Sequence, residues 1–280
     1  MRFFVHDITV GQETVPLRCY IPDVCGKTSY EGRRPAVIIF PGGAYCMTYH
    51  GEAEPIALQY VAEGICAFVL DYSCKPIHFP YQQLEAFAAI RYVREHAEEF
   101  GIAKNNIATS GFSAGGHLCA CTGTLWNKFD TWLKEYGMDD VDVRTYRPDK
   151  LILCYPVIKA YTRFAHFGSI ENLLGAAQLS NEELVRLVSL DLQVDGDTPP
   201  SFLWHTAEDT DVPSRNSLDF AAALTEYGVL YEMHVFPYAP HGACLGTCVT
   251  NDVPFDRPLE LHEWIDKAIR FAYNENVLKG

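Results

Sequence analysis

The pentapeptide Gly111-Phe112-Ser113-Ala114-Gly115 has the pattern G-x-S-x-G, and its place in the chain supports a nucleophilic serine. It lies between an apolar run, Ile107–Ser110, and the helix-like segment His117–Leu125. A serine at a sharp strand-to-helix turn needs small neighbours, because its backbone is strained and bulk would clash. The helix that follows points its first amides toward the serine, where negative charge develops during acyl transfer. We therefore predict Ser113 as a nucleophile rather than part of a structural glycine turn.

A serine nucleophile needs a base to take its proton, and His241 is in the right place to be that base. With this motif, the acid and then the histidine follow the serine along the chain. His241 lies in a turn-rich loop directly after the apolar run Tyr231–Phe236. Parallel sheets collect their ligands beyond the carboxyl ends of their strands. The other nine histidines are predicted to be structural, with His205 hydrogen-bonded near the site and His117 packed in the helix after the serine.

Three acids compete for the role of orienting the histidine. Glu208, Asp209 and Asp211 all follow the apolar run Phe202–His205. Asp209 is the preferred candidate, because it sits a few residues past the strand end, where a loop acid can turn back toward the sheet. Asp211 is the alternative, and Glu208 is expected to be a solvated loop charge.

The glycine-rich segment Pro41–Tyr45 is predicted to supply an oxyanion hole. It comes directly after the apolar run Val37–Phe40, and its small residues allow backbone amides to approach a substrate oxygen closely. The expected donors are the amides of Gly43 and Ala44, together with Ala114 after the nucleophile. Tyr45 is a candidate substrate-binding residue. A phosphate-binding turn would look similar, but the chain contains neither G-K-S/T nor G-x-G-x-x-G.

Composition narrows the classes of partner. The chain has 280 residues and a formal net charge of −14, which opposes binding to nucleic acid or to an anionic membrane and favours a small neutral substrate. Its N-terminus lacks the apolar core of a signal peptide and no run of about eighteen apolar residues occurs, so a cytoplasmic protein with reduced cysteines is expected. His241, Cys244 and Cys248 have no carboxylate or second histidine nearby to complete a tetrahedral site, so no metal site is predicted. The oligomeric state is left open.

The elements that must position these residues alternate along the chain. Short β-branched runs alternate with longer helical patterns, which predicts an α/β fold with a mostly parallel sheet and helices on both faces. Two early segments, Phe3–Val10 and Val15–Ile21, predict an antiparallel hairpin before it. Residues 1–280 are expected to form a single domain with a small lid-like insertion at about 157–200. The expected strands and helices are Ala36–Phe40, Cys66–Leu70, Ile107–Ser110, Leu151–Tyr155, Phe202–His205, Tyr231–Phe236, a helix from Pro80 to about Phe100, Ser214–Tyr227 and about Leu259–Tyr273.

These motifs together resemble the α/β-hydrolase superfamily over most of the chain. Pro41–Tyr45 is similar to the HGGG loop of carboxylesterases and hormone-sensitive-lipase-like enzymes, with Pro41 in place of the histidine and Ala44 in place of the last glycine. Gly111–His117 resembles their nucleophile elbow. Phe202–Pro213 resembles the D-x-x-V-P acid loop of bacterial acetyl esterases, which further favours Asp209. The acetyl-xylan-esterase-like group is the most similar branch, also on the segments Asp71–Pro76, Phe79-Pro80, Gly168–Gly175 and Phe236–Gly242.

The resemblance implies an activity that needs no cofactor. We expect a serine carboxylic-ester hydrolase that removes short acyl groups, acetyl above all, from carbohydrates or related small esters. One alternative is a broader short-chain carboxylesterase or a peptidase-like serine hydrolase of the same fold. The other is a non-catalytic binding protein that has kept the fold, because a fold does not guarantee a function.

Overall fold

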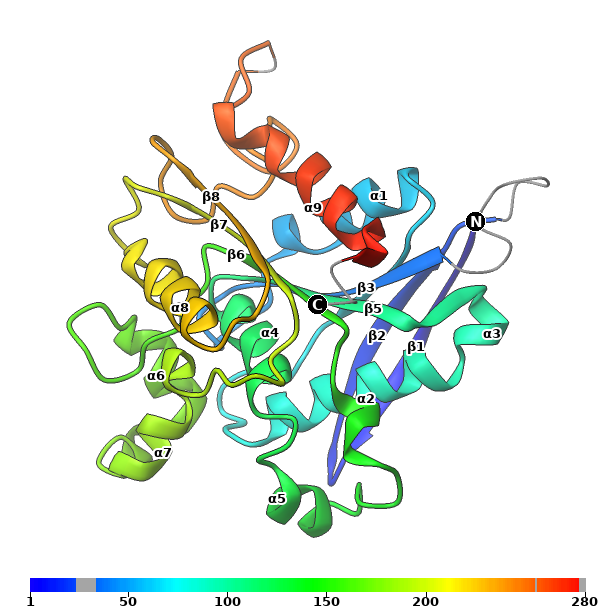
Figure 1. Cartoon of the computed structure of the whole chain (residues 1–280), viewed down its shortest axis with the longest axis vertical. Coiled ribbons are helices and arrows are strands. Elements are labelled where there is room, and N and C mark those ends of the chain that lie inside the picture. Colours follow the sequence, from blue (N-terminus) through cyan, green and yellow to red (C-terminus); the bar gives the residue numbers. More distant parts are fainter. Residues whose placement is uncertain (24–33, 255, 277–280) are drawn as a thin grey trace.

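The strands form one eight-stranded sheet at the centre of the molecule (Figure 1). The computed structural model describes residues 1–23, 34–254 and 256–276. Along the sheet the order is β1-β2-β4-β3-β5-β6-β7-β8. The strands are β1 (Arg2–Val10), β2 (Glu13–Ile21), β3 (Arg34–Phe40), β4 (Cys66–Leu70), β5 (Ile102–Phe112), β6 (Lys150–Cys154), β7 (Ser201–Thr206) and β8 (Tyr231–Phe236).

The pairing directions confirm the predicted fold class. β1 and β2 form an antiparallel hairpin that closes with Val10 opposite Glu13, and β2 runs antiparallel to β4. All remaining neighbours, from β4 through β3 to β8, are parallel. Parallel strands end at the same edge of a sheet, so the loops that follow β3, β5, β7 and β8 meet there.

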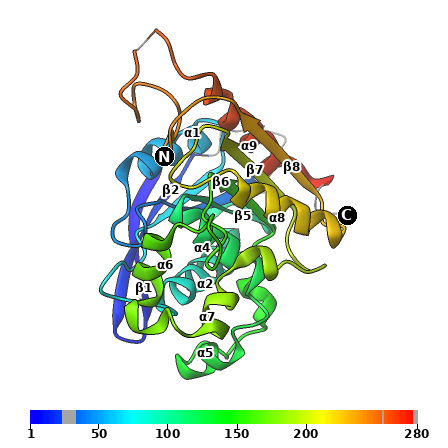
Figure 2. The same cartoon turned by 90° about the vertical axis from the view of Figure 1, so that its left-hand side faces the viewer.

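Helices cover both faces of the sheet, as Figures 1 and 2 show. α1 and α9 pack on one face and α2, α4 and α8 on the other, which gives two separate apolar cores. The helices are α1 (Glu54–Ala62), α2 (Tyr81–Glu95), α3 (Ala97–Phe100), α4 (Ala114–Thr124), α5 (Asp130–Glu135), α6 (Phe167–Leu174), α7 (Glu182–Leu187), α8 (Arg215–Glu226) and α9 (Trp264–Tyr273).

Several boundaries differ from those predicted. The helix expected from Pro80 to Phe100 is broken at His96 into α2 and α3, and Gly101 then ends it in the left-handed region at φ 66°. The expected final helix begins as a short 3₁₀ turn, Glu260–Glu263, and becomes α-helical at Trp264. α1 was not predicted. β8 is half-exposed rather than buried because it lies at the edge of the sheet.

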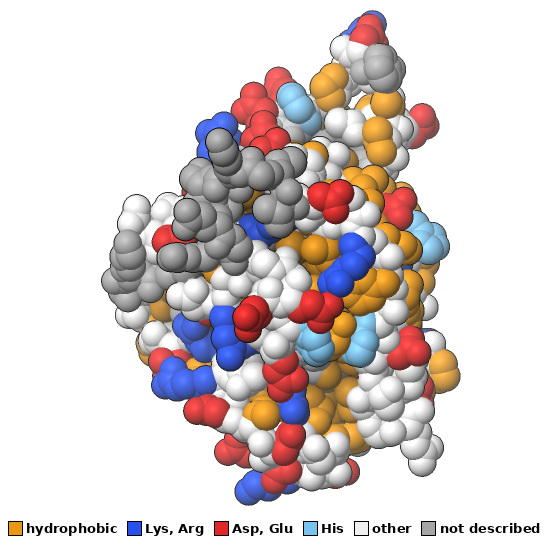
Figure 3. Space-filling model, turned by 90° about the vertical axis from the view of Figure 1, so that its right-hand side faces the viewer, with side chains coloured by type: hydrophobic (Ala, Val, Ile, Leu, Met, Phe, Trp, Pro, Cys, Tyr) orange, Lys and Arg blue, Asp and Glu red, His pale blue; other side chains and the backbone are white. Residues whose placement is uncertain are grey.

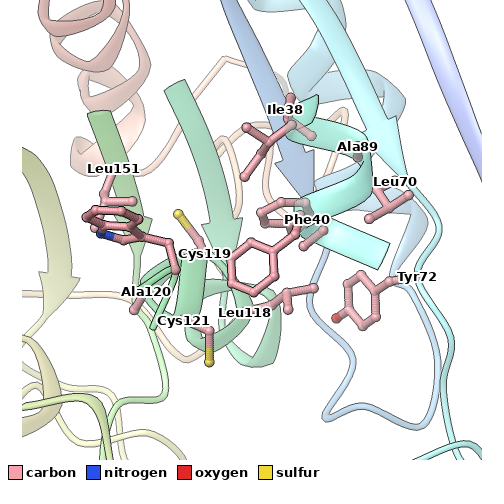
Figure 4. Close-up of a cluster of buried hydrophobic side chains, with 14 of the residues drawn as sticks. Ile38, Phe40, Leu70, Tyr72, Ala89, Leu118, Cys119, Ala120, Cys121 and Leu151 are labelled. Atoms are coloured by element: carbon pink, nitrogen blue, oxygen red, sulfur yellow. The ribbon is translucent and has the colours of Figure 1, made fainter. Parts of the chain in front are cut away.

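The helix behind the predicted nucleophile is enclosed by protein on every side. All residues of α4 are buried, which is the behaviour of a helix inside a core rather than on a surface. Figure 4 shows Leu118, Cys119 and Cys121 of α4 packed among side chains from the strands, including Ile38 and Phe40 of β3. A helix held this firmly fixes the position of the residue that precedes it, which is Ser113.

The insertion expected at 157–200 contains α6 and α7 with short 3₁₀ turns. Its start is attached to α8 through Asn216, whose Oδ1 accepts hydrogen bonds from the amides of Ile158 and Lys159 at 3.0 Å. The ammonium group of Lys159 also contacts Asp191 and Asp219. The lid function of this segment and the single-domain organisation stay predictions.

The surface mixes apolar and charged side chains. Figure 3, which shows the side of the molecule where β1 lies in Figure 1, has acidic and basic groups interspersed with apolar ones. No helix within residues 1–23, 34–254 and 256–276 is both long and apolar enough to cross a lipid bilayer. The nine cysteines in this part of the chain are all free thiols.

Candidate active site

Ser113 occupies a strained turn between β5 and α4. Its backbone has φ 54° and ψ −117°, a conformation that costs a non-glycine residue on the order of 1–3 kcal/mol. The turn is closed by glycines with no room for a side chain. A Cβ on Gly111 would lie 2.1 Å from the carbonyl oxygen of Gly115, and one on Gly115 would lie 2.0 Å from that of Phe40. The G-x-S-x-G pattern therefore follows from backbone crowding.

The structure brings Ser113, His241 and Asp209 together in a single hydrogen-bonded row. Nε2 of His241 lies 2.7 Å from Oγ of Ser113, and Nδ1 of His241 lies 2.7 Å from Oδ2 of Asp209. A carboxylate can only accept, so Nδ1 carries the ring proton and Nε2 is free to accept the serine proton. The three side chains come from loops after β5, β7 and β8. This geometry can activate a hydroxyl for attack on a carbonyl carbon.

Asp209 is held in place mainly by its own loop. Its Oδ1 accepts hydrogen bonds from the amides of Asp211 and Val212 at 3.1 and 2.9 Å. Oδ2 also lies 3.3 Å from Nε2 of His205. Burial alone would raise the pKa of Asp209, but hydrogen bonds from His205, His241 and Val212 hold the pKa well below its usual range. The carboxyl group is therefore ionised when it orients His241.

The competing acids of this loop point elsewhere. Asp211 contributes its backbone amide to Asp209, and its side chain is exposed. Glu208 is exposed as well, as expected for a solvated loop charge. His205 is fully buried between Ser217 and the carbonyl oxygen of Val212, at 2.8 and 2.7 Å from its two ring nitrogens. Its position beside Asp209 makes it a support for the acid rather than a second base.

The predicted oxyanion loop, Pro41–Tyr45, lies against Ser113. A Cβ on Gly42 would be 3.0 Å from Cβ of Ser113, so the two turns are in van der Waals contact. Gly43 and Ala44 have φ values of 128° and 54°. In the described part of the chain, no backbone oxygen or side chain accepts a hydrogen bond from the amides of Gly43, Ala44 or Ala114. Amides without a protein acceptor are what an oxyanion hole requires, and their role stays a prediction.

Side chains from distant segments support this loop, and none of them was singled out from the sequence. Oε2 of Glu52 accepts from the amide of Gly42 at 2.6 Å. The hydroxyl of Tyr72 donates to the carbonyl oxygen of Pro41 at 2.6 Å, and Nδ2 of Asn172 donates to that of Ala44 at 2.9 Å. Tyr72 and Asn172 lie in segments that resemble the acetyl-xylan-esterase-like group, but the resemblance gave no role for either. Nothing in the sequence around Glu52 marks it as different from an ordinary acid at a helix start.

The position of Tyr45 corrects the prediction that it binds substrate. Its side chain has no exposed surface and packs in the core, so a substrate cannot contact it in this conformation. The hydroxyl lies 2.8 Å from Nδ1 of His117, whose Nε2 donates to the carbonyl oxygen of Val188. Burial lowers the pKa of His117 to about 4, so the ring is neutral and accepts from Tyr45. Tyr45 therefore anchors the end of the oxyanion loop to α4.

His241, Cys244 and Cys248 are not grouped as the ligands of a metal site would be. Cys244 is buried beside Tyr155 and Glu52, whereas Cys248 is exposed. Within residues 1–23, 34–254 and 256–276, no group of three or more histidine, cysteine or acidic side chains is arranged to hold a metal ion.

Comparisons with known proteins match this architecture. The model of the BD-FAE family matches residues 23–224. The chain is 39% identical over 216 residues to endo-1,4-beta-xylanase B of Butyrivibrio fibrisolvens, covering 75% of this chain and 32% of that protein. It is 28% identical over 232 residues to an acetylxylan esterase of Xylanibacter ruminicola, covering 82% of this chain and 44% of that protein. The chain thus spans less than half the length of either of these two relatives.

Among solved structures, the acetyl ester-xyloside bifunctional hydrolase from Caldicellulosiruptor lactoaceticus is similar over nearly the whole chain. The two share 37% sequence identity and superpose with a TM-score of 0.80, which covers 95% of this chain and 90% of that one.

Proposed function

The chain belongs to the BD-FAE family and is an acetyl-xylan-esterase-like α/β-hydrolase, and on that premise we propose that it is a serine carboxylic-ester hydrolase. We further propose that it removes short acyl groups, acetyl above all, from carbohydrates or related small esters. The observation that carries the reaction type is the row from Ser113 through His241 to Asp209, in which both contacts measure 2.7 Å.

The proposed catalytic cycle follows from the protonation states of Ser113, His241 and Asp209. Nε2 of His241 takes the proton of Ser113 while the serine oxygen attacks the ester carbonyl carbon. The amides of Gly43, Ala44 and Ala114 stabilise the oxyanion that forms. His241 then gives the proton to the leaving alcohol, and water attacks the acyl-enzyme with the same residue as base. Asp209 stays ionised and stabilises the positive charge that His241 carries between these steps.

The proposed substrate class has support from two sources. Two of the similar proteins are named for acetyl-ester or acetylxylan chemistry, and the third is named a xylanase. The net charge of −14 disfavours an anionic substrate, whereas an acetylated neutral sugar carries no charge to repel.

The proposal is tested by acetate release from 4-nitrophenyl acetate and from acetylated xylo-oligosaccharides. We expect the wild type to act on both, and Ser113→Ala to lose at least about 10⁴-fold in kcat/KM on each. Ser110→Ala, the same substitution three residues earlier in β5, is the matched control and should keep the rate within a few-fold.

The outcomes separate the alternatives. Turnover of the aryl ester alone would reject the carbohydrate substrate and favour a broader carboxylesterase. Hydrolysis of aminoacyl-arylamides would favour a peptidase. Failure of folded wild type to act on any of these substrates, and of Ser113 to react with a fluorophosphonate, would favour a non-catalytic protein.

A further inference from the structure

Glu52 is a buried acid that has no cationic partner in the described part of the chain. It ends a short 3₁₀ turn, His50–Glu52, between β3 and α1, and only 2% of it is exposed. A buried carboxylate is costly unless hydrogen bonds satisfy it. Both of its oxygens are occupied by partners in different loops, and Sγ of Cys244 also lies 3.8 Å from Oε1.

One carboxylate oxygen of Glu52 holds the oxyanion loop. Oε2 accepts from the amide of Gly42 at 2.6 Å, so this amide is already occupied by a protein acceptor. The next two amides, those of Gly43 and Ala44, have no hydrogen-bond acceptor among the described residues. The contact with Glu52 thus selects which donors of the loop are available.

The other oxygen holds the histidine loop through Tyr155. Oε1 lies 2.6 Å from the hydroxyl of Tyr155, and the oxygen of that hydroxyl accepts from the amide of Cys244 at 3.2 Å. The tyrosine proton is therefore free to donate to Glu52. The Tyr155 ring stands edge-on to the His241 ring, with centroids 5.1 Å apart, and Cys244 follows His241 by three residues.

In both contacts the partner donates a hydrogen bond to the Glu52 carboxylate, and such hydrogen bonds favour its ionised form. Burial raises the pKa of Glu52, and the hydrogen bonds from Tyr155 and Gly42, with the nearby charge of His241, oppose that rise. The same buried group is thus tied to the loop that would bind the oxyanion and to the loop that carries the base.

We propose that Glu52 is a positioning residue that sets the placement of the oxyanion loop relative to His241 by holding Gly42 with one oxygen and Tyr155 with the other. This inference rests on the proposed esterase function. Glu52 does not touch the reacting atoms, so its loss should act on the transition state more than on substrate binding. A displacement of about 1 Å in such a site can cost on the order of 10²-fold in rate.

The test compares Glu52→Gln with Glu54→Gln. Glu54 is a matched control because it also bonds a tyrosine hydroxyl, that of Tyr20, but it is exposed and this partner lies in β2 rather than in a loop of the site. The measurements are kcat and KM for 4-nitrophenyl acetate, the melting temperature, and the Ki of phenylboronic acid, which forms a tetrahedral anionic adduct with a reactive serine. For Glu52→Gln we expect kcat to fall about 10- to 100-fold with KM within threefold, and the boronate Ki to rise by a similar factor. Glu54→Gln should keep kcat, KM and the boronate Ki within twofold of wild type.

Several outcomes would overturn the inference. These are a folded Glu52→Gln enzyme with kcat within threefold of wild type, a loss carried by KM alone, or equal losses in both variants. If Glu52→Gln does not fold, Tyr155→Phe decides, because it keeps the Gly42 contact and removes the hydroxyl that links Glu52 to the amide of Cys244, leaving only the 3.8 Å contact between Sγ of Cys244 and Oε1 of Glu52. We expect about a tenfold fall in kcat, and unchanged kcat would reject the proposal. A wild type without ester hydrolysis would instead reject the proposed function, and with it the premise of this inference.

Discussion

Two neighbouring turns at the same edge of the sheet are held in place by different kinds of contact. The turn around Ser113 is shaped by backbone atoms, because a Cβ on Gly111 would meet the carbonyl oxygen of Gly115, one on Gly115 would meet that of Phe40 at the end of β3, and α4 is buried on all sides. The oxyanion loop after β3 has backbone hydrogen bonds of its own and is held in addition by side chains, those of Glu52 from the same connection and of Asn172 from the insertion. The first turn is determined by close contacts between backbone groups. The second depends on the rest of the fold being in place.

The comparison explains which parts of the site could be predicted from sequence. Backbone crowding demands glycine at fixed spacing, so it leaves a motif that can be read directly. The acid loop is also local, since Asp209 accepts from amides two and three residues further on. A side chain that reaches across the fold, as Asn172 does, has no such signature.

The largest effect is expected from adding a methyl group to the backbone-determined turn. In Gly115→Ala the new Cβ would lie 2.0 Å from the carbonyl oxygen of Phe40 and 2.4 Å from that of Pro41, and neither backbone group can move cheaply. We expect a loss of at least about 3 kcal/mol of unfolding free energy, with no measurable esterase activity. Urea denaturation and kcat/KM measure both.

Gly196→Ala is the control for this variant, because a Cβ there meets no atom within 4 Å. Its stability should stay within about 0.5 kcal/mol of wild type. A stable and active Gly115→Ala enzyme would show that the turn is not determined by backbone crowding.

The next largest effect is expected from the acid loop. Asp209→Asn should keep the fold but lower kcat/KM by about 10⁴-fold, because an amide no longer favours the tautomer of His241 that carries its proton on Nδ1. Asp211→Asn is the matched control, and its exposed side chain should be replaceable with less than a threefold change. A larger loss in Asp211→Asn than in Asp209→Asn would move the acid role to the other residue.

An intermediate effect is expected where the insertion reaches the oxyanion loop. Asn172→Ala removes the donor to the carbonyl oxygen of Ala44, and we expect kcat to fall about tenfold with little change in KM. Asn181→Ala, in the same insertion, removes the cap of α7 and should lower the melting temperature without changing kcat. Equal kcat values in the two variants would mean that the oxyanion loop keeps its shape without the hydrogen bond from Asn172.

Other features of the structure also differ in whether neighbours along the chain or contacts with distant residues determine them. All eight strands were predicted to within a few residues, except that β5 begins five residues earlier than the apolar run at Ile107. Period and composition are local properties, so they reveal strands. The break at His96 and the burial of Tyr45 depend on what packs against them, and a single sequence does not show that. Tyr45 directly follows the predicted oxyanion donors along the chain, and its contact with His117, 72 residues away, has no sign in the sequence.

The smallest effect on rate is expected from Glu85, a support two steps away from the oxyanion loop. Glu85 accepts from the amide of Ser73 at 2.8 Å and bonds its hydroxyl at 2.5 Å, and the neighbouring Tyr72 holds Pro41. Burial raises the pKa of Glu85 to about 7. A carboxyl group whose pKa is raised on folding contributes stability below its unfolded pKa, and that contribution is lost as the pH rises through about 7.

Glu85→Gln should therefore be more stable than wild type at pH 8, by on the order of 2 kcal/mol, and the difference should shrink toward pH 4.5. The glutamine amide can accept from the backbone of Ser73 with its oxygen and donate to the hydroxyl with its nitrogen, so kcat at pH 7 should change less than twofold. Melting temperatures across this pH range measure the first expectation, and ester hydrolysis the second. A gain in stability that is equal at both pH values would exclude the titration of Glu85 as its cause. A large fall in kcat would instead show that the oxyanion loop depends on supports even this far away.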